Sequence, residues 1–163
     1  MPPDDQSTDD QQSPPSPGGS IATTASGLIG HNGSSILPFL RQNGQSLDSA
    51  HANWCAAFVN GVLSANGVAG TEGATKNIAT SFLNWGTPGE GELQPGDVLV
   101  QPRGHPAGGI GGHVGIATGH IAEGNGQTFV LMQSGNLHGR VAYSWEPASG
   151  LVVRRAPPST QAQ

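Results

Sequence analysis

Two residues of this chain, Cys55 and His113, could together carry out nucleophilic chemistry. Cys55 is the only cysteine, and it opens a run whose apolar residues recur every three or four positions, the spacing of a helix. His113 begins the strand-like run Gly112-His113-Val114-Gly115-Ile116. Unpaired backbone N–H groups at a helix start and a facing imidazolium both favour a thiolate, so we expect the thiol pKa to be lowered. The pattern predicts a cysteine–histidine pair that attacks a carbonyl carbon.

Other interpretations of these residues stay open. A lone cysteine can be a buried core residue with no reactive role. The remaining histidines lie in loop-like or turn-like surroundings, where we expect solvated side chains: His31, His51, His105, His120 and His138. A zinc site is disfavoured, because the chain has no His-Glu-x-x-His helix. Such a site would combine Glu123 with His105, His113 and His120. We therefore expect neither a metal nor a cofactor.

A cysteine–histidine pair also needs a residue that orients the imidazole ring. Asn136 is the first choice and Gln133, nearer the end of its strand, is the second. A turn or capping role for Asn136 stays open. The glycine-rich run 108–112 lacks the helix and the Gly-Lys-Ser/Thr signature of a phosphate loop. We expect it to border the histidine where substrate approaches, and we assign Trp54, Gly112 and Gln133 to substrate contact.

Composition and charge exclude several classes of protein. The length of 163 residues suits one domain, and the formal net charge is −5 with only six Lys and Arg residues. Such a chain has no basic patch for nucleic acid or for an anionic membrane surface, and no apolar run long enough to cross a bilayer. A single cysteine excludes an internal disulfide. The acidic, polar N-terminus lacks the basic start and apolar stretch of a secretory signal.

The apolar pattern predicts an α+β domain in which helices come first and strands follow. Residues 1–20 and 156–163 are poor in apolar side chains, so we expect disordered tails around a folded domain at 21–155. Helices are expected at 21–29, from about 34 or 35 through 40 with Pro38 in the first turn, at 54–65 with Asn53 as N-cap, and at 75–85. Five strands are expected at 97–100, 113–118, 128–132, 140–145 and 151–154. The Gly and Asn turns between them favour an antiparallel sheet.

Four segments of the chain match, in order, motifs of one enzyme family. They are Asn53-Trp54-Cys55-Ala56-Ala57-Phe58-Val59-Asn60, Ser81-Phe82-Leu83-Asn84-Trp85-Gly86, Leu93-Gln94-Pro95-Gly96-Asp97-Val98 and Gly112-His113-Val114-Gly115-Ile116. Over about residues 21–155 the chain resembles the NlpC-type and CHAP-type cysteine peptidases and amidases of bacterial cell walls. The resemblance implies a papain-like α+β fold, with N-terminal helices packed on a five- or six-stranded antiparallel sheet.

The resemblance also implies an activity and its residues. It implies cleavage of an amide bond in the peptidoglycan stem peptide, or of the bond between muramic acid and the first alanine. Cys55 would be the nucleophile, His113 the base and acid, and Asn136 the third polar residue. Many relatives have Gly-Gly-Asn-Gln where this chain has Ser134-Gly135-Asn136-Leu137, so the third position departs from the family pattern.

The sequence leaves two other functions open. One is a papain-like hydrolase that acts on a different amide or ester, and the other is a non-catalytic module that binds the cell wall or serves a structural role. For the wall hydrolase we expect a monomer whose partner is peptidoglycan rather than nucleic acid or membrane. Without a secretory signal, we expect delivery to the wall or periplasm by a carrier, namely a virion, a lysis system or a secretion apparatus.

Overall fold

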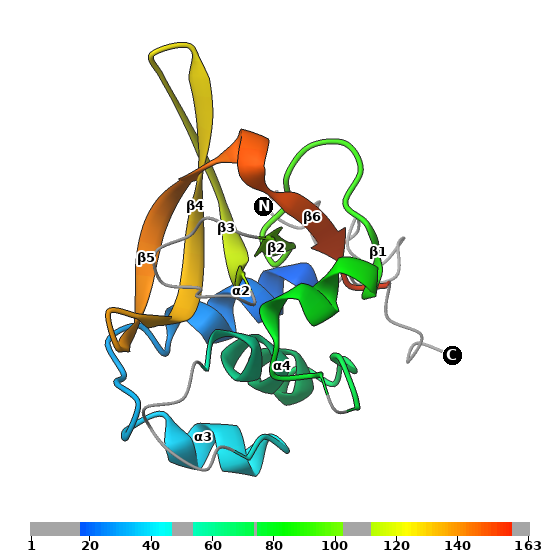
Figure 1. Cartoon of the computed structure of the whole chain (residues 1–163), viewed down its shortest axis with the longest axis vertical. Helices are drawn as coiled ribbons and strands as arrows, with labels where there is room; N and C mark the ends of the chain where they lie inside the picture. The colour runs from blue at the N-terminus through cyan, green and yellow to red at the C-terminus, as the bar shows by residue number, and fades with distance from the viewer. Residues whose placement is uncertain (1–16, 47–53, 74, 103–111, 158–163) are drawn as a thin grey trace, which may run out of the picture.

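One six-stranded antiparallel sheet organises the chain (Figure 1), with the strand order β1-β6-β2-β3-β4-β5. The computed structural model describes residues 17–46, 54–73, 75–102 and 112–157. The strands are β1 (Thr87–Pro88), β2 (Val98–Gln101), β3 (His113–Gly124), β4 (Gln127–Leu137), β5 (Arg140–Pro147) and β6 (Val152–Arg155). The predicted α+β class and antiparallel sheet are confirmed. Five strands lie where the alternating pattern placed them, and β1 is too short to give such a pattern.

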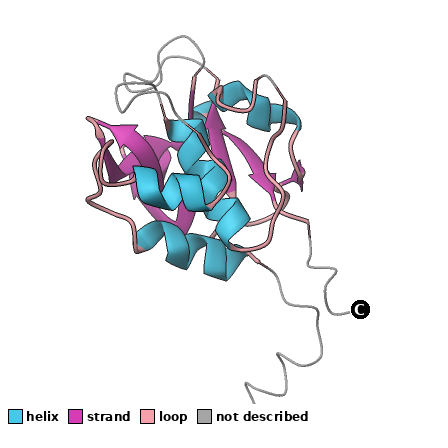
Figure 2. Cartoon of the chain, turned by 90° about the horizontal axis from the view of Figure 1, so that it is seen from below, coloured by secondary structure: helices cyan, strands magenta, loops and turns pink. Residues whose placement is uncertain are grey.

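The helices precede the sheet in sequence and cover one of its faces (Figure 2). They are α2 (Gly18–Ser26), α3 (Leu37–Gln42) and α4 (Cys55–Ala65). Pro38 lies in the first turn of α3, as predicted, where its missing N–H costs no helical hydrogen bond. Both α2 and α4 contact β3 and β4. The two longer helices therefore pack on the strands that carry the candidate site.

The ends of the domain differ from the expected boundaries. Helix α2 begins at Gly18, so residues 18–20 are helical although we expected them in the N-terminal tail. At the other end Ala156 is buried, although it was assigned to the C-terminal tail. The remainder of both expected tails, apart from Pro157, lies outside the described residues. Small and polar residues at 18–20 gave no apolar signal, which explains the late start of the predicted helix.

The segment predicted as a helix at 75–85 is mostly a different structure. Only Ala79–Asn84 is helical, and it forms a 3-10 helix, η1. Ile78 is in an extended conformation and is 43% exposed, while Phe82 and Trp85 are buried and pack edge to face, with ring centroids 5.7 Å apart. A spacing of three residues suits a 3-10 turn as well as an α-helix. The prediction that these apolar side chains belong to the core is therefore right for Phe82 and Trp85 and wrong for Ile78.

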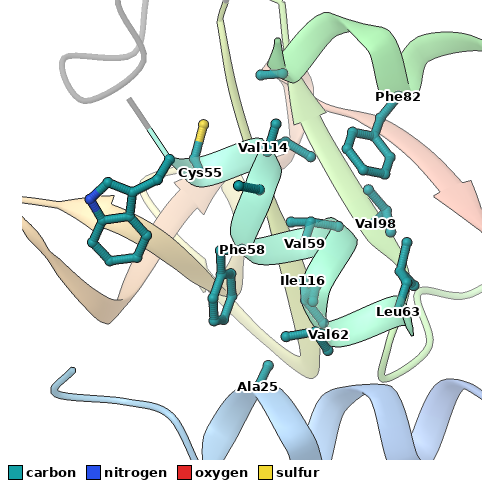
Figure 3. Packing of buried hydrophobic residues seen from close by; sticks show 14 of the residues in the cluster. Ala25, Cys55, Phe58, Val59, Val62, Leu63, Phe82, Val98, Val114 and Ile116 are labelled. Carbon is teal, nitrogen blue, oxygen red and sulfur yellow. The ribbon is translucent and has the colours of Figure 1, made fainter. Parts of the chain in front are cut away.

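The main core lies between α4 and the sheet (Figure 3). Helix α4 contributes Phe58, Val59, Val62 and Leu63, and the sheet contributes Val98, Val114 and Ile116. All seven side chains are fully buried. Because side chains alternate along a strand, the two β3 residues in this set fix which face of β3 meets the helices. The packing thus sets the position of the α4 start relative to the start of β3.

Candidate active site

Cys55 is the first residue of α4, as predicted, and its side chain is 2% exposed. Trp54 stands at the N-cap position and makes no capping hydrogen bond through its side chain. The expected cap, Asn53, lies outside the described residues. With no capping side chain there, the backbone groups of Cys55 and Ala56 hydrogen-bond to the Cys55 sulfur. The helix start therefore supplies the donors that a thiolate needs.

Burial raises the pKa of the Cys55 thiol above its ordinary value of 9.0, because the charged form loses its solvation. Backbone hydrogen bonds from Val114, Ala56 and Cys55 itself lower the pKa, but they do not outweigh burial. The helix start thus does lower the pKa of Cys55, as predicted, but the prediction of a lowered pKa overall is wrong, because burial raises it by more. In this environment the thiol is neutral at neutral pH, and a base must take its proton before it can act as a nucleophile.

The Val114 hydrogen bond brings the sulfur to the backbone of the residue next to His113. Val114 is the second residue of β3, and His113 is the first. A bond from the Val114 backbone to the Cys55 sulfur therefore brings the sulfur to the beginning of this strand. The structure joins the α4 start, which carries the thiol, to the strand start, which carries the imidazole.

The imidazole of His113 is fully buried and is held by a serine. Its Nε2 lies 2.9 Å from Ser134 Oγ, which is also fully buried. The pairing of Ile116 with Gln133 places Ser134 opposite Gly115, on the same alternating set as His113. Sequence reasoning missed Ser134, because its place opposite Gly115 depends on a strand register that the sequence alone does not give. Ser134 is therefore one residue whose side chain lies within hydrogen-bond distance of His113.

Asn136 and Gln133, the two residues predicted to orient the ring, lie at different places on β4. Asn136 has a positive φ of 62° and lies where the pairing of β4 with β5 shifts, between Ser134 and Leu137. Asparagine tolerates this left-handed conformation, which fits the turn role left open for Asn136. The role of Asn136 beside the His113 ring stays a prediction. Gln133 belongs to the other alternating set of β4, and its Nε2 donates to the Ala22 carbonyl of α2, 3.3 Å away.

The other predicted substrate contacts serve the backbone and the core. Trp54 is 1% exposed, and its ring packs against β4 where Gly135 has no side chain. A Cβ on Gly135 would lie 2.7 Å from that ring. Gly112 is buried with φ +80°, and a Cβ there would lie 2.5 Å from the Gln101 carbonyl oxygen. Both residues shape the site from inside, and the expected contact of Trp54 with substrate stays a prediction.

The remaining histidines do not join this site within the described part of the chain. His31 is half-buried and its Nδ1 lies 3.1 Å from Ser35 Oγ, whereas His120 and His138 are exposed. His51, His105 and the glycine run 108–111 lie outside the described residues. Across residues 17–46, 54–73, 75–102 and 112–157, no three His, Cys, Asp or Glu side chains come together as metal ligands would.

Comparison with known proteins adds no family to this geometry. Neither a family model, nor a curated protein, nor a solved structure matches the chain. None of the helices in the described ranges has the length and apolar character needed to cross a bilayer. The chemistry of the site must therefore be argued from its own residues.

Proposed function

We propose that the chain is a papain-like cysteine hydrolase that cleaves an amide bond in or next to the peptidoglycan stem peptide. One observation carries the proposal: the Cys55 sulfur, at the first residue of α4, hydrogen-bonds the backbone of Val114, the neighbour of His113. Acyl transfer requires a nucleophile and a base that takes its proton, and the residue before Val114 is His113, whose imidazole is buried and hydrogen-bonded. The choice of peptidoglycan rests on the resemblance of the four sequence motifs to wall hydrolases.

The first half of the reaction forms an acyl-enzyme. Because burial keeps the thiol neutral, His113 takes the proton as Cys55 attacks the amide carbonyl, rather than before substrate arrives. The carbon–sulfur bond forms and the carbonyl π electrons move to oxygen. Backbone N–H groups at the α4 start stabilise that oxyanion. The tetrahedral intermediate then collapses, the carbon–nitrogen bond breaks, and His113 returns the proton to the leaving amine.

The second half consumes water. His113 removes a proton from a water molecule, which attacks the thioester carbonyl, and the thiol leaves with that proton as the carboxylic acid product forms. Ser134 acts through His113: its hydroxyl, 2.9 Å from Nε2, holds the ring in one orientation through both halves. This is the positioning role that the third residue fills in nucleophile–base–orienter sites.

Zymography on purified cell wall tests the proposal. The full chain should clear the wall, while Cys55→Ala, Cys55→Ser and His113→Ala should not. Ser144→Ala is the matched control, because the buried Ser144 Oγ on β5 makes no hydrogen bond, so activity should persist. Clearing by Cys55→Ala protein would reject the nucleophile. Mass spectrometry of the released muropeptides would identify the bond.

A second candidate function is a non-catalytic wall-binding or structural module with the same fold. The observation that favours it is the burial of Cys55, which is 2% exposed and has a raised pKa. The rate of labelling by iodoacetamide as a function of pH separates the two. A hydrolase in which His113 serves as base should label measurably at neutral pH, and His113→Ala should abolish that labelling. A module should resist labelling at neutral pH with or without His113.

If wall is not cleared although Cys55 reacts, a third arrangement is favoured, in which the same fold hydrolyses another amide or ester. A panel of peptide and ester substrates would then show turnover that depends on Cys55.

In the proposed wall function the chain acts as a monomer on peptidoglycan and reaches it through a virion, a lysis system or a secretion apparatus. Sedimentation of the full chain tests the first of these expectations.

A further inference from the structure

The molecule has a hollow whose lining does not include Cys55. It has a volume of about 520 Å³ and is lined by residues of α2, β3, β4 and β5 and by Pro95. None of its lining residues is Cys55, His113 or Ser134. It shares β4 with the candidate active site, because Gln133 lines the hollow and the next residue, Ser134, holds His113. Two adjacent residues of β4 therefore belong to two different sites, Gln133 to the hollow and Ser134 to the candidate active site.

Gln133, one of the residues that line the hollow, carries an unsatisfied acceptor. Gln133 is fully buried, and its Nε2 donates to the Ala22 carbonyl. A carbonyl can only accept, so this bond fixes the amide orientation and leaves Oε1 as the other end. Oε1 is buried and has no hydrogen-bond partner. A buried acceptor without a donor is unfavourable, so a ligand that brings an N–H or O–H group there would relieve the deficit.

The walls of the hollow indicate an uncharged ligand with both polar and apolar surface. None of the lining residues is Asp, Glu, Lys or Arg. Thr23, Ser26 and Thr118 supply hydroxyl groups, and Leu131 supplies an apolar surface. Pockets of this composition bind neutral ligands through a few placed polar groups.

An exposed aromatic ring completes the hollow. Tyr143 lines it and is 47% exposed, and its hydroxyl lies 3.1 Å from Ser26 Oγ, which ties the ring to α2. Tyr143 pairs with Gln133 across β4 and β5, so the ring stands directly beside the unsatisfied amide. Trp145, two residues along the same face of β5, is 49% exposed. Exposed aromatic rings beside hydroxyl and amide groups suit the flat C–H face of a sugar ring.

We propose that this hollow is a binding site for a neutral saccharide that carries an acetamido group. The sugar ring stacks on Tyr143, its hydroxyls meet the serine and threonine side chains, and its acetamido N–H donates to Gln133 Oε1. The acetyl methyl lies against Leu131. The ligand class follows from the lining alone. Only the identification of its natural source as the glycan strand of peptidoglycan rests on the proposed function.

Calorimetric titration with the tetramer of N-acetylglucosamine tests the site in the full chain carrying Cys55→Ala, which excludes turnover. We expect saturable binding. Loss of a stacked ring in Tyr143→Ala should weaken it by about tenfold, whereas Tyr143→Phe, which keeps the ring, should bind as before. Gln133→Met, of similar length without the acceptor, should also weaken binding. Ile78→Ala is the control, because Ile78 is exposed but does not line the hollow.

The outcomes separate this site from the proposed activity. No binding of the tetramer, or equal binding by the Tyr143→Ala protein, would overturn the site. Equal binding of cellotetraose, which lacks acetamido groups, would overturn the contact with Gln133. Because titration needs no active nucleophile, sugar binding by a chain that fails to clear wall would leave the saccharide site standing and remove the proposed cleavage of peptidoglycan.

Discussion

Replacing Ser134 with alanine tests the link between the two strands that frame the candidate active site. The change removes one atom, Ser134 Oγ, and with it the 2.9 Å hydrogen bond to His113 Nε2. Both side chains are fully buried, so water cannot take the place of the hydroxyl without a rearrangement of the core. The backbone of β4 is unaffected, because alanine adopts the same conformation as serine.

The size of the effect follows from this burial. Removing one partner of a buried hydrogen bond costs about 1–3 kcal/mol, because the other partner keeps its desolvation penalty. For a domain of this size each kcal/mol lowers the midpoint of thermal unfolding by about 4 °C. We therefore expect Ser134→Ala to lower the midpoint by about 4–12 °C. In the proposed hydrolase, freedom of the His113 ring should also reduce the rate of wall clearing.

Thermal and urea unfolding of two alanine variants make the assay. Ser144→Ala on β5 is the same substitution at a partly buried site, but the Ser144 hydroxyl has no hydrogen-bond partner, so its loss should leave stability unchanged or slightly raised. A difference between the variants isolates the hydrogen bond. If Ser134→Ala unfolds at the same midpoint as Ser144→Ala, the reasoning about the His113 contact is refuted.

Three further predictions concern the surroundings of the site. The free energy of unfolding should fall as pH rises above 9.0, because burial keeps Cys55 protonated in the folded chain while the unfolded thiol ionises; the fall should be smaller in Cys55→Ala, as urea titrations at several pH values would show. Gly135→Ala should destabilise by about 1–3 kcal/mol in urea unfolding, since its Cβ would lie 2.7 Å from Phe58 and Trp54 atoms, whereas Gly124→Ala, with 3.9 Å of room, should not. Asp97→Asn should destabilise by about 3 kcal/mol, because the buried carboxylate binds the Arg155 guanidinium at 2.7 and 2.9 Å; calorimetry would detect no change if that bond is unimportant.

The sequence predicts the sheet and α4 because their signals are local. Apolar residues at helical spacing from Cys55 onward mark a helix that the structure places at Cys55–Ala65. Alternation marks five of the six strands. The segment after residue 75 was misread because Phe82 and Trp85 fit a 3-10 turn as well as an α-helix, and spacing alone does not separate the two.

The details of the site depend on register, which a single sequence leaves undetermined. Asn136 and Gln133 follow from residue type and distance to the strand end, whereas Ser134 is placed near His113 by the pairing of Ile116 with Gln133. The raised pKa of Cys55 follows from how deeply the helix start is buried, which no spacing reveals. The saccharide site escaped notice because its residues come from α2, β3, β4 and β5.

The alternation of β4 has a consequence for how the protein could be altered. Gln133 and Ser134 are neighbours on opposite faces of the strand, so a single-residue insertion or deletion in β4 upstream of them would exchange the two. The amide would then turn toward the imidazole and the hydroxyl toward α2, and both places would lose their chemistry in one step. Length changes at the Asn125-Gly126 tip, where both residues have positive φ, leave that phase untouched. Grafts and labels therefore belong at the hairpin tip, and the strand itself must keep its residue count.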